Sequence, residues 1–323
     1  MKTMYFGSVR FFKNMILLVV IVLIVTPTVL AVRWGFALRA QRQENQQLTQ
    51  TLEQQAQQYR EELDHLAQLE DAMEVALTEE VQQEAQPPAV ESDAIAYQQL
   101  YPDFYAPQEL NASAYHEGVI YLTFDDGPSD RTPEVLEILR EKNVKATFFV
   151  VGQTDEEHLQ YMRDIVADGH TIGMHTYSHQ YKTIYASVES FLADMYGIFS
   201  QIRDTTGVAP TVFRFAGGSV NAYNHTIYQE IIAEMLRRGF VPHDWNLASA
   251  DAAATSVPAA TIVANVVNAA ASKPRGVVLM HDSQYKYTTV EALPTMIDQL
   301  LEMGFTLDRL SADTQPILFS YPD

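Results

Sequence analysis

From Gly118 onward, short apolar runs of strand-like composition alternate with longer segments of helical periodicity. This alternation is typical of βαβ units, in which each helix leads the chain back to a further parallel strand. The expected strands lie at 119–124, 146–152, 170–175, 211–218, 240–247, 276–282 and 305–310. The helices expected between them lie near 131–142, 156–168, 187–206, 224–238, 258–271 and 289–303. The pattern predicts an α/β fold with a mostly parallel sheet, either open or closed into a barrel.

The N-terminal part of the chain has a different composition. Residues 15–32 carry no charged side chain, and this run is close to the roughly 20 residues that a membrane-spanning helix needs. A secretory signal peptide would have a shorter apolar core, although Val-Leu-Ala at 29–31 could serve as its cleavage site. The length of the run favours a cytoplasmic tail at 1–14, a transmembrane anchor and an extracellular remainder. Cleavage would instead release a secreted protein.

Residues 36–86 contain no glycine or proline and are rich in Gln, Glu, Ala and Leu, which are tolerated in helices. Apolar side chains fall near the a and d positions of a heptad repeat at Leu48, Leu52, Tyr59, Leu66, Leu69 and Met73. Gln55 and Glu62 interrupt this seam, so the helical stalk is either a weak, self-associating coiled coil or a solvated helix without a partner. The prolines at 87–88 begin a linker over 87–117, and the α/β domain is expected at 118–323.

Composition excludes several classes of function. The formal net charge of −20 argues against a nucleic-acid partner, because phosphate binding needs a basic surface. The chain has no cysteine, which excludes disulfides, thiol nucleophiles and cysteine-ligated zinc. A transition-metal site would therefore have to be built from His, Asp or Glu.

The residues suited to chemistry follow the expected strands, where active residues of parallel α/β folds gather. They are Asp125, Asp126, His175, His179, Arg214, Asp251 and His281. On a continuing strand, the two neighbouring aspartates would face opposite sides, but the turn at Gly127-Pro128 allows both to reach one site. The two histidines are four residues apart, so one helical turn would place them on one face. Together with an aspartate they would form a His₂Asp set with open positions, which is typical of a catalytic metal.

Five segments, in this order, resemble the motifs of the NodB-homology polysaccharide deacetylases, carbohydrate esterase family 4. They are TFDDGPS at 123–129, HTYSH at 175–179, RFAGGS at 214–219, DWNLASAD at 244–251 and VLMHD at 278–282. The resemblance covers about residues 118–310. It implies a distorted (β/α) barrel of the polysaccharide deacetylase type, and it implies that this barrel hydrolyses acetyl groups with the help of a metal.

The resemblance also implies roles for single residues. Asp126, His175 and His179 would hold a divalent cation, most simply Zn²⁺, with Co²⁺, Ni²⁺ or Fe²⁺ as alternatives. Asp125 would be the general base, stabilised in its ionised form by a bidentate contact from Arg214.

The other half of the implied site consists of an acid and a pocket. His281 would protonate the leaving amine, and Asp251, rather than Asp244, would tune this histidine. The positions implied at the acetyl pocket are Gly217, whose N–H would face the oxyanion, Leu279, and Trp245, which is expected on the strand beneath. The chain departs from the family pattern at Ala216, where a proline is usual, and at Ala252, where a tryptophan is usual, so a wider pocket is expected.

The resulting hypothesis is a membrane-tethered extracellular enzyme that removes N-acetyl groups from a β-linked amino-sugar polymer. Peptidoglycan is the favoured substrate because a tethered enzyme would lie beneath the cell wall, and a chitin-like glycan is the alternative. Two other functions stay open from the sequence. The same site could act on O-acetyl esters, or the domain could be a degenerate carbohydrate-binding or scaffold module.

Overall fold

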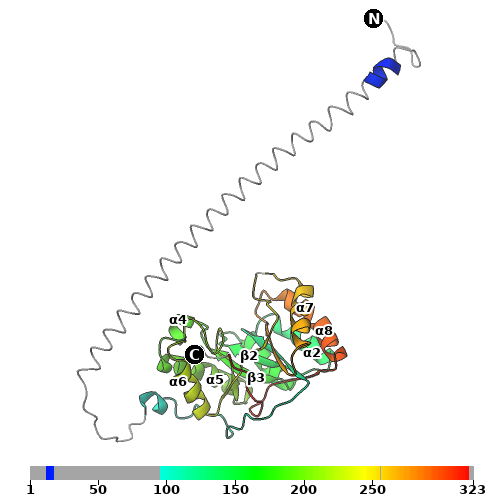
Figure 1. Cartoon of the computed structure of the whole chain (residues 1–323). Helices are drawn as coiled ribbons and strands as arrows, with labels where there is room; N and C mark the ends of the chain where they lie inside the picture. The colour runs from blue at the N-terminus through cyan, green and yellow to red at the C-terminus, as the bar shows by residue number, and fades with distance from the viewer. Residues whose placement is uncertain (1–11, 18–94, 255, 320–323) are drawn as a thin grey trace, which may run out of the picture. The chain divides into compact units, whose positions relative to one another are not determined.

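The computed structural model in Figure 1 describes residues 12–17, 95–254 and 256–319. Residues 12–17 are helical, whereas the stalk at 36–86 and most of the expected anchor lie outside the described residues. No helix within the described part of the chain is both long and apolar enough to cross a membrane. The chain separates into two compact units, Met1–Val90 and Glu91–Asp323, and the second contains all the expected motifs.

Eight strands form one parallel sheet in the second unit. They are β1 (Val119–Asp125), β2 (Thr147–Val151), β3 (Thr171–Thr176), β4 (Val212–Phe213), β5 (Val241–Pro242), β6 (Leu247–Ala248), β7 (Gly276–His281) and β8 (Thr306–Asp308). The strand order is β5-β4-β3-β2-β1-β7-β6, and β8 pairs with the first residues of β1. This is the curled half-barrel form of the expected (β/α) barrel.

Helices cover one face of the sheet, and all of them except η1 lie between successive strands. They are η1 (Ala96–Gln99), α2 (Thr132–Glu141), α3 (Glu156–Ala167), α4 (Tyr181–Ile184), α5 (Val188–Thr206), α6 (Tyr228–Arg237), α7 (Ala259–Ala270) and α8 (Tyr287–Glu302). Local chemistry sets several of their ends. The side chains of Asp155 and Ser187 cap α3 and α5, and Gly207, with a φ of 74°, ends α5. The short helix α4 was not expected from the sequence.

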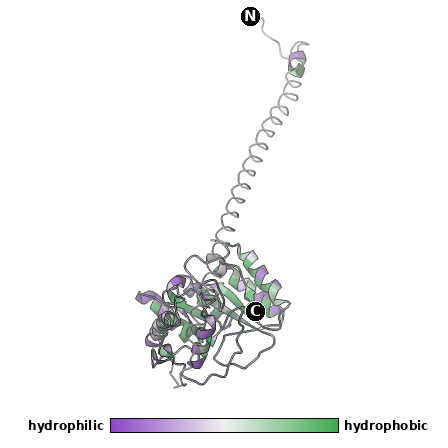
Figure 2. Ribbon diagram, turned by 60° about the vertical axis from the view of Figure 1, so that its left-hand side comes forward, coloured by the Kyte–Doolittle hydropathy of each residue, from purple (hydrophilic) through white to green (hydrophobic). Residues whose placement is uncertain are grey.

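The two faces of the sheet contribute to separate apolar cores. On β1, Ile120, Leu122 and Phe124 pack beneath the helices in the outer core, whereas Tyr121 belongs to a smaller inner core. This is the alternation that a strand with both faces buried requires. In Figure 2 the central strands carry mostly hydrophobic residues, and hydrophilic residues gather on the exposed sides of the helices. The inner face is therefore free to carry polar groups at its C-terminal edge.

The half-barrel is open between β5 and β6. The chain passes from one to the other through residues 243–246, and so crosses from one end of the strand order to the other. The expected single strand at 240–247 is therefore wrong, because these residues form two short strands at opposite edges. Trp245 lies between the two strands and not on either of them.

The segment before Gly118 packs on the sheet and helices from Ile95 onward. Arg238, at the end of α6, is 1% exposed, and Glu234 accepts a hydrogen bond from its Nε. Its other guanidinium nitrogens donate to the carbonyls of Tyr97, Leu100, Tyr101 and Phe104. Because a buried arginine satisfies these carbonyls, residues 97–104 of the expected linker are joined to the domain.

Candidate active site

Alternation along three strands, β1, β3 and β7, brings several of the expected site residues to one place. Asp125 follows Tyr121 and Thr123 on the inner face of β1, and His281 follows Val277 and Leu279 on that face of β7. The parallel register pairs Asp125 directly with His281. The same two-residue alternation applies to β3, where Met174 faces the outer core and His175 therefore faces the inner side of the sheet. The C-terminal edge of the inner face thus collects residues from both ends of the domain sequence.

Asp126, His175 and His179 form a compact group of metal-ligating side chains. Their ligand atoms all lie within 4.8 Å of one another. Oδ1 of Asp126 is 3.4 Å from Nε2 of His175 and 3.2 Å from Nε2 of His179. Asp126 adopts a φ of 69° and His179 a φ of 53°, so two of the three ligands stand on left-handed backbone. The three residues would supply three ligands to a cation and would leave further coordination positions open.

The surroundings of this group fit a cation. Nδ1 of His175 lies 2.9 Å from the carbonyl of Arg214, which fixes that nitrogen as the donor and leaves Nε2 with its lone pair. Oδ1 of Asp126 is buried and makes no hydrogen bond in the described part of the chain. The acceptor nitrogen of His175 and the acceptor oxygen of Asp126 therefore face each other beside Nε2 of His179, and a divalent cation could bind all three atoms.

The ionisation of the group supports the same interpretation. Burial opposes the charge of Asp126, but the adjacent imidazoles of His175 and His179 hold its pKa well below the usual range. Burial also opposes protonation of His175, yet the charges of Asp125 and Asp126 raise its pKa. The carboxylates therefore create a strongly negative position that attracts positive charge, whether a proton or a metal ion.

The structural reason for the spacing of the two histidines differs from the expected one. The sequence interpretation placed His175 and His179 on one helical turn. His175 instead lies on β3, which ends at Thr176, and His179 lies in the following loop before α4. The carboxylate of Asp194 accepts the N–H groups of Tyr177 and Ser178 and so holds this loop in place.

The expected base, Asp125, is 3% exposed and lies beside a buried arginine. Nη1 of Arg214 donates to Oδ1 of Asp125 at 2.8 Å and to the Thr123 hydroxyl at 2.6 Å. The bidentate contact expected from the sequence is wrong, because Nε and Nη2 donate to the carbonyls of His243 and Asp244. Four hydrogen bonds thus hold the guanidinium of Arg214, and Nη1 is the nitrogen that contacts the base Asp125.

The expected acid, His281, forms a buried pair with Asp251. Nδ1 of His281 lies 2.8 Å from Oδ1 of Asp251, while the backbone N–H of His281 and the Thr289 hydroxyl donate to Oδ2. Burial lowers the pKa of His281, but the hydrogen bond and charge of Asp251 outweigh it and raise the pKa to about 9. The imidazole is therefore protonated at neutral pH, with Nε2–H free to act as an acid.

Three further expected residues lie around these groups. Leu279 is half-buried on the inner face of β7, two residues before His281. Gly217 adopts a φ of 79°, and a Cβ there would lie 2.8 Å from the Tyr181 ring, so only glycine fits. Trp245 stands beside the Arg214 guanidinium, with 5.7 Å between Cζ of Arg214 and the ring centre.

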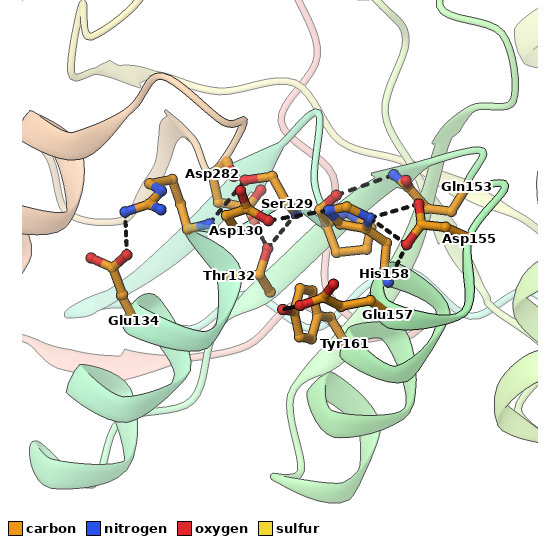
Figure 3. Close-up of polar contacts among 12 residues, drawn as sticks. Ser129, Asp130, Thr132, Glu134, Gln153, Asp155, Glu157, His158, Tyr161 and Asp282 are labelled. Atoms are coloured by element: carbon orange, nitrogen blue, oxygen red, sulfur yellow. Dashed lines mark hydrogen bonds and ion pairs between the residues drawn. The ribbon is translucent and has the colours of Figure 1, made fainter.

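Asp282 directly follows His281, and the sequence alone favours capping of the next element over orientation of this histidine. Asp282 is fully buried and contacts the start of α2 instead (Figure 3). The hydroxyl of Thr132 donates to its Oδ2, and that of Ser129 donates to its carbonyl, each at 2.5 Å. A Cβ on Gly127 would lie 2.5 Å from the carboxyl carbon of Asp282. Asp282 therefore packs beneath the turn that follows Asp125 and Asp126.

Fold and site together define a hydrolase of the polysaccharide deacetylase class. The family model described as polysaccharide deacetylase matches residues 112–235, which include Asp125, Asp126, His175, His179 and Arg214. The chain belongs to this family.

Two relatives show how far the similarity extends. The chain is 32% identical over 206 residues to a peptidoglycan-N-acetylglucosamine deacetylase of Bacillus cereus, a match that covers 63% of this chain and 72% of the relative. Among solved structures, it is similar to the catalytic domain of a peptidoglycan N-acetylglucosamine deacetylase from Eubacterium rectale. That likeness has a TM-score of 0.62 and 31% identity, and it covers 66% of this chain and 97% of the other.

Proposed function

We propose that this enzyme is a metal-dependent N-deacetylase that acts on the amino sugars of peptidoglycan. The observation that carries the proposal is the placement of a buried base and a protonated acid on neighbouring strands, next to the His₂Asp group. The peptidoglycan substrate is supported by the names of the Bacillus cereus and Eubacterium rectale relatives, both peptidoglycan N-acetylglucosamine deacetylases. Zn²⁺ is the proposed cation because two imidazoles and one carboxylate suit it.

The proposed reaction uses a cation site, a general base and a general acid, each supplied by residues of this chain. A cation held by Asp126, His175 and His179 would make water more acidic and polarise the acetyl carbonyl. Asp125 accepts a proton from the attacking water, and Arg214 stabilises the carboxylate that it needs for this task. His281 then donates the proton on Nε2 to the leaving nitrogen, while Asp251 stabilises the imidazolium until that step. The N–H of Gly217 is the proposed donor to the oxyanion.

Acetate release from purified peptidoglycan tests the proposal. Chitin oligomers and O-acetylated xylan serve as comparison substrates, and the variant Asp125→Asn serves as the inactive control. We expect release from peptidoglycan that a chelator abolishes and that added Zn²⁺ restores. Release that a chelator leaves unchanged would overturn the metal-dependent mechanism. Faster release from xylan would assign the site to O-acetyl esters instead.

The proposed location is the outer face of the cell membrane, with residues 15–32 as the anchor and 36–86 as the stalk. This part of the proposal rests on the uncharged apolar run and on the helix-favouring composition of the sequence. Fractionation of cells, combined with N-terminal sequencing of the mature protein, tests it. An intact N-terminus in the membrane fraction supports an anchor, and a new N-terminus near residue 32 supports a cleaved signal peptide.

A further inference from the structure

Residues 315–319, here called the tail segment, lie against the chain that crosses the open side of the half-barrel. Nη1 of Arg275 donates to the carbonyl of Gln315 at 2.9 Å. The backbone N–H of Asp244 donates to the carbonyl of Ile317, and the N–H of Phe319 donates to Oδ2 of Asp244, both at 2.8 Å. The tail segment therefore pairs with Asp244 through both backbone and side chain.

Asp244 connects the tail segment to two parts of the active site. Its carboxylate also accepts the N–H of Ser219 at 2.8 Å and the Ser219 hydroxyl. Its carbonyl accepts Nη2 of Arg214 at 3.0 Å, and Arg214 in turn contacts Asp125. A single buried residue thus joins the tail segment to the loop at 217–219 and to the arginine that supports the base.

The ring of Phe319 makes a second contact with the same loop. It packs edge-on against Trp245, with 4.7 Å between ring centres. Gly218 has a φ of 91°, and a Cβ at this position would overlap Cε2 of Phe319. The ring therefore lies directly against the backbone next to Gly217, whose N–H is the proposed oxyanion donor.

The donors around Asp244 are essential to its burial. The residue is fully buried, and burial raises its pKa, so each donor offsets part of the cost of removing a carboxylate from water. The N–H of Phe319 is one of three such donors. A displaced tail segment would therefore leave Asp244 free to shift, together with the loop and Arg214.

We propose that the tail segment, acting through Phe319 and Asp244, positions the Gly217 amide and Arg214 for the reaction. Phe319 and Asp244 are positioning residues, since they act through the loop and through Arg214. The inference rests on the proposed deacetylase function. It requires that disturbance of the tail segment slows the chemical step more than it weakens binding of Zn²⁺, because the hydrogen bonds and ion pairs described for the three metal ligands involve other residues.

The test compares Phe319→Ala with a matched control, Phe305→Ala. Phe305 is also partly buried, but it packs against the outer core just before β8, at the opposite end of β1 from the site. Deletion of an oxyanion donor lowers kcat by about 10²–10³. We therefore expect a displaced donor to lower kcat on a chitin oligomer by about tenfold or more. Zn²⁺ affinity should stay within about twofold of the wild type, and Phe319→Leu, which keeps part of the bulk, should be intermediate.

Hydrogen exchange provides a readout that does not depend on catalysis. The N–H groups of Gly218 and Ser219 are hydrogen-bonded to Phe215 and Asp244, so their exchange is expected to accelerate in Phe319→Ala but not in Phe305→Ala. Unchanged exchange at 215–219 would overturn the inference, as would a fall in kcat matched by an equal fall in Zn²⁺ affinity. A wild-type protein that releases no acetate would refute the proposed function, and the exchange result would still decide the role of the tail segment.

Discussion

Replacement of Asp251 by asparagine should convert His281 from a protonated acid into a neutral imidazole at working pH. Asp251 is 3% exposed, and its carboxylate contacts both Nδ1 and the backbone N–H of His281. Burial by itself lowers the pKa of His281, so the rise to about 9 depends on the charge and hydrogen bond that Asp251 supplies. Asparagine keeps the shape of the side chain but removes the charge.

The magnitude follows from the two pKa values. A fall from about 9 to the ordinary value of about 6.5 corresponds to roughly 3.4 kcal/mol, at about 1.36 kcal/mol per unit. At pH 7.5 the protonated fraction of His281 would fall from about 97% to about 9%, which alone predicts a roughly tenfold loss of rate. The negative charges of Asp125 and Asp126 also help to raise the pKa of His281, and a bound cation would offset them. The value of about 9 is therefore the upper limit of the wild-type pKa of His281.

The assay is the pH dependence of kcat/KM for acetate release between about pH 6 and 10. For the wild type we expect the basic limb to fall near or somewhat below pH 9, and for Asp251→Asn below about pH 7. Asp298→Asn, which removes an exposed partner of Lys142, is the matched control. A basic limb that stays in place in Asp251→Asn would refute the assignment of His281 and Asp251. The raised pKa of His281 should also stabilise the fold fully near pH 6.5, and this contribution is lost as the pH rises through about 9. The lowered pKa of Asp251 contributes stability that is lost instead in acid, as this carboxylate takes up a proton.

Three further predictions concern the base, its arginine and the turn. Asp125→Asn should lower the rate by about 10²–10⁴ without a change in Zn²⁺ affinity. Asp126→Asn should instead weaken Zn²⁺ binding, and an equal loss of metal in both variants would show that the two roles are assigned wrongly. Arg214→Lys should lower kcat by about 100-fold, because a lysine cannot reach the base and two carbonyls together; a wild-type rate would contradict this. Gly127→Ala should cost about 1–3 kcal/mol of stability through its overlap with Asp282, and an unchanged Tm would show that Asp282 moves aside.

Much of the fold follows from local patterns that the sequence displays directly. The strand at 119–124 and the helices near 131–142 and 258–271 lie within one or two residues of β1, α2 and α7. Strong periodicity and clear breaks at glycine and proline make such elements readable. The segment 240–247 was misread as one strand, because its residues have a continuous strand-like composition while the chain crosses an open sheet. Composition does not record which edge of a sheet a residue joins.

The active site, like the fold, was predicted only in part from the sequence. The resemblance to the family implied that Asp251, and not Asp244, partners His281, and the structure shows a 2.8 Å contact between them. The single-nitrogen contact from Arg214 to Asp125 was not foreseen, because the other nitrogens bind carbonyls of a segment about 30 residues away. Backbone carbonyls leave no trace in side-chain identity, so no motif could indicate them.

The sequence by itself determined the parallel α/β class, the ends of β1, β2, β3 and β7, and the residue types able to hold a cation, a base and an acid. These depend on periodicity and on side-chain chemistry, which are local properties. Only the tertiary structure decided that Asp282 lies beneath the turn at Gly127, and that Phe319 meets Asp244 on the open side of the half-barrel. Both contacts join segments more than 70 residues apart. Such contacts arise from how the sheet curls and closes over its inner face, which no local pattern specifies.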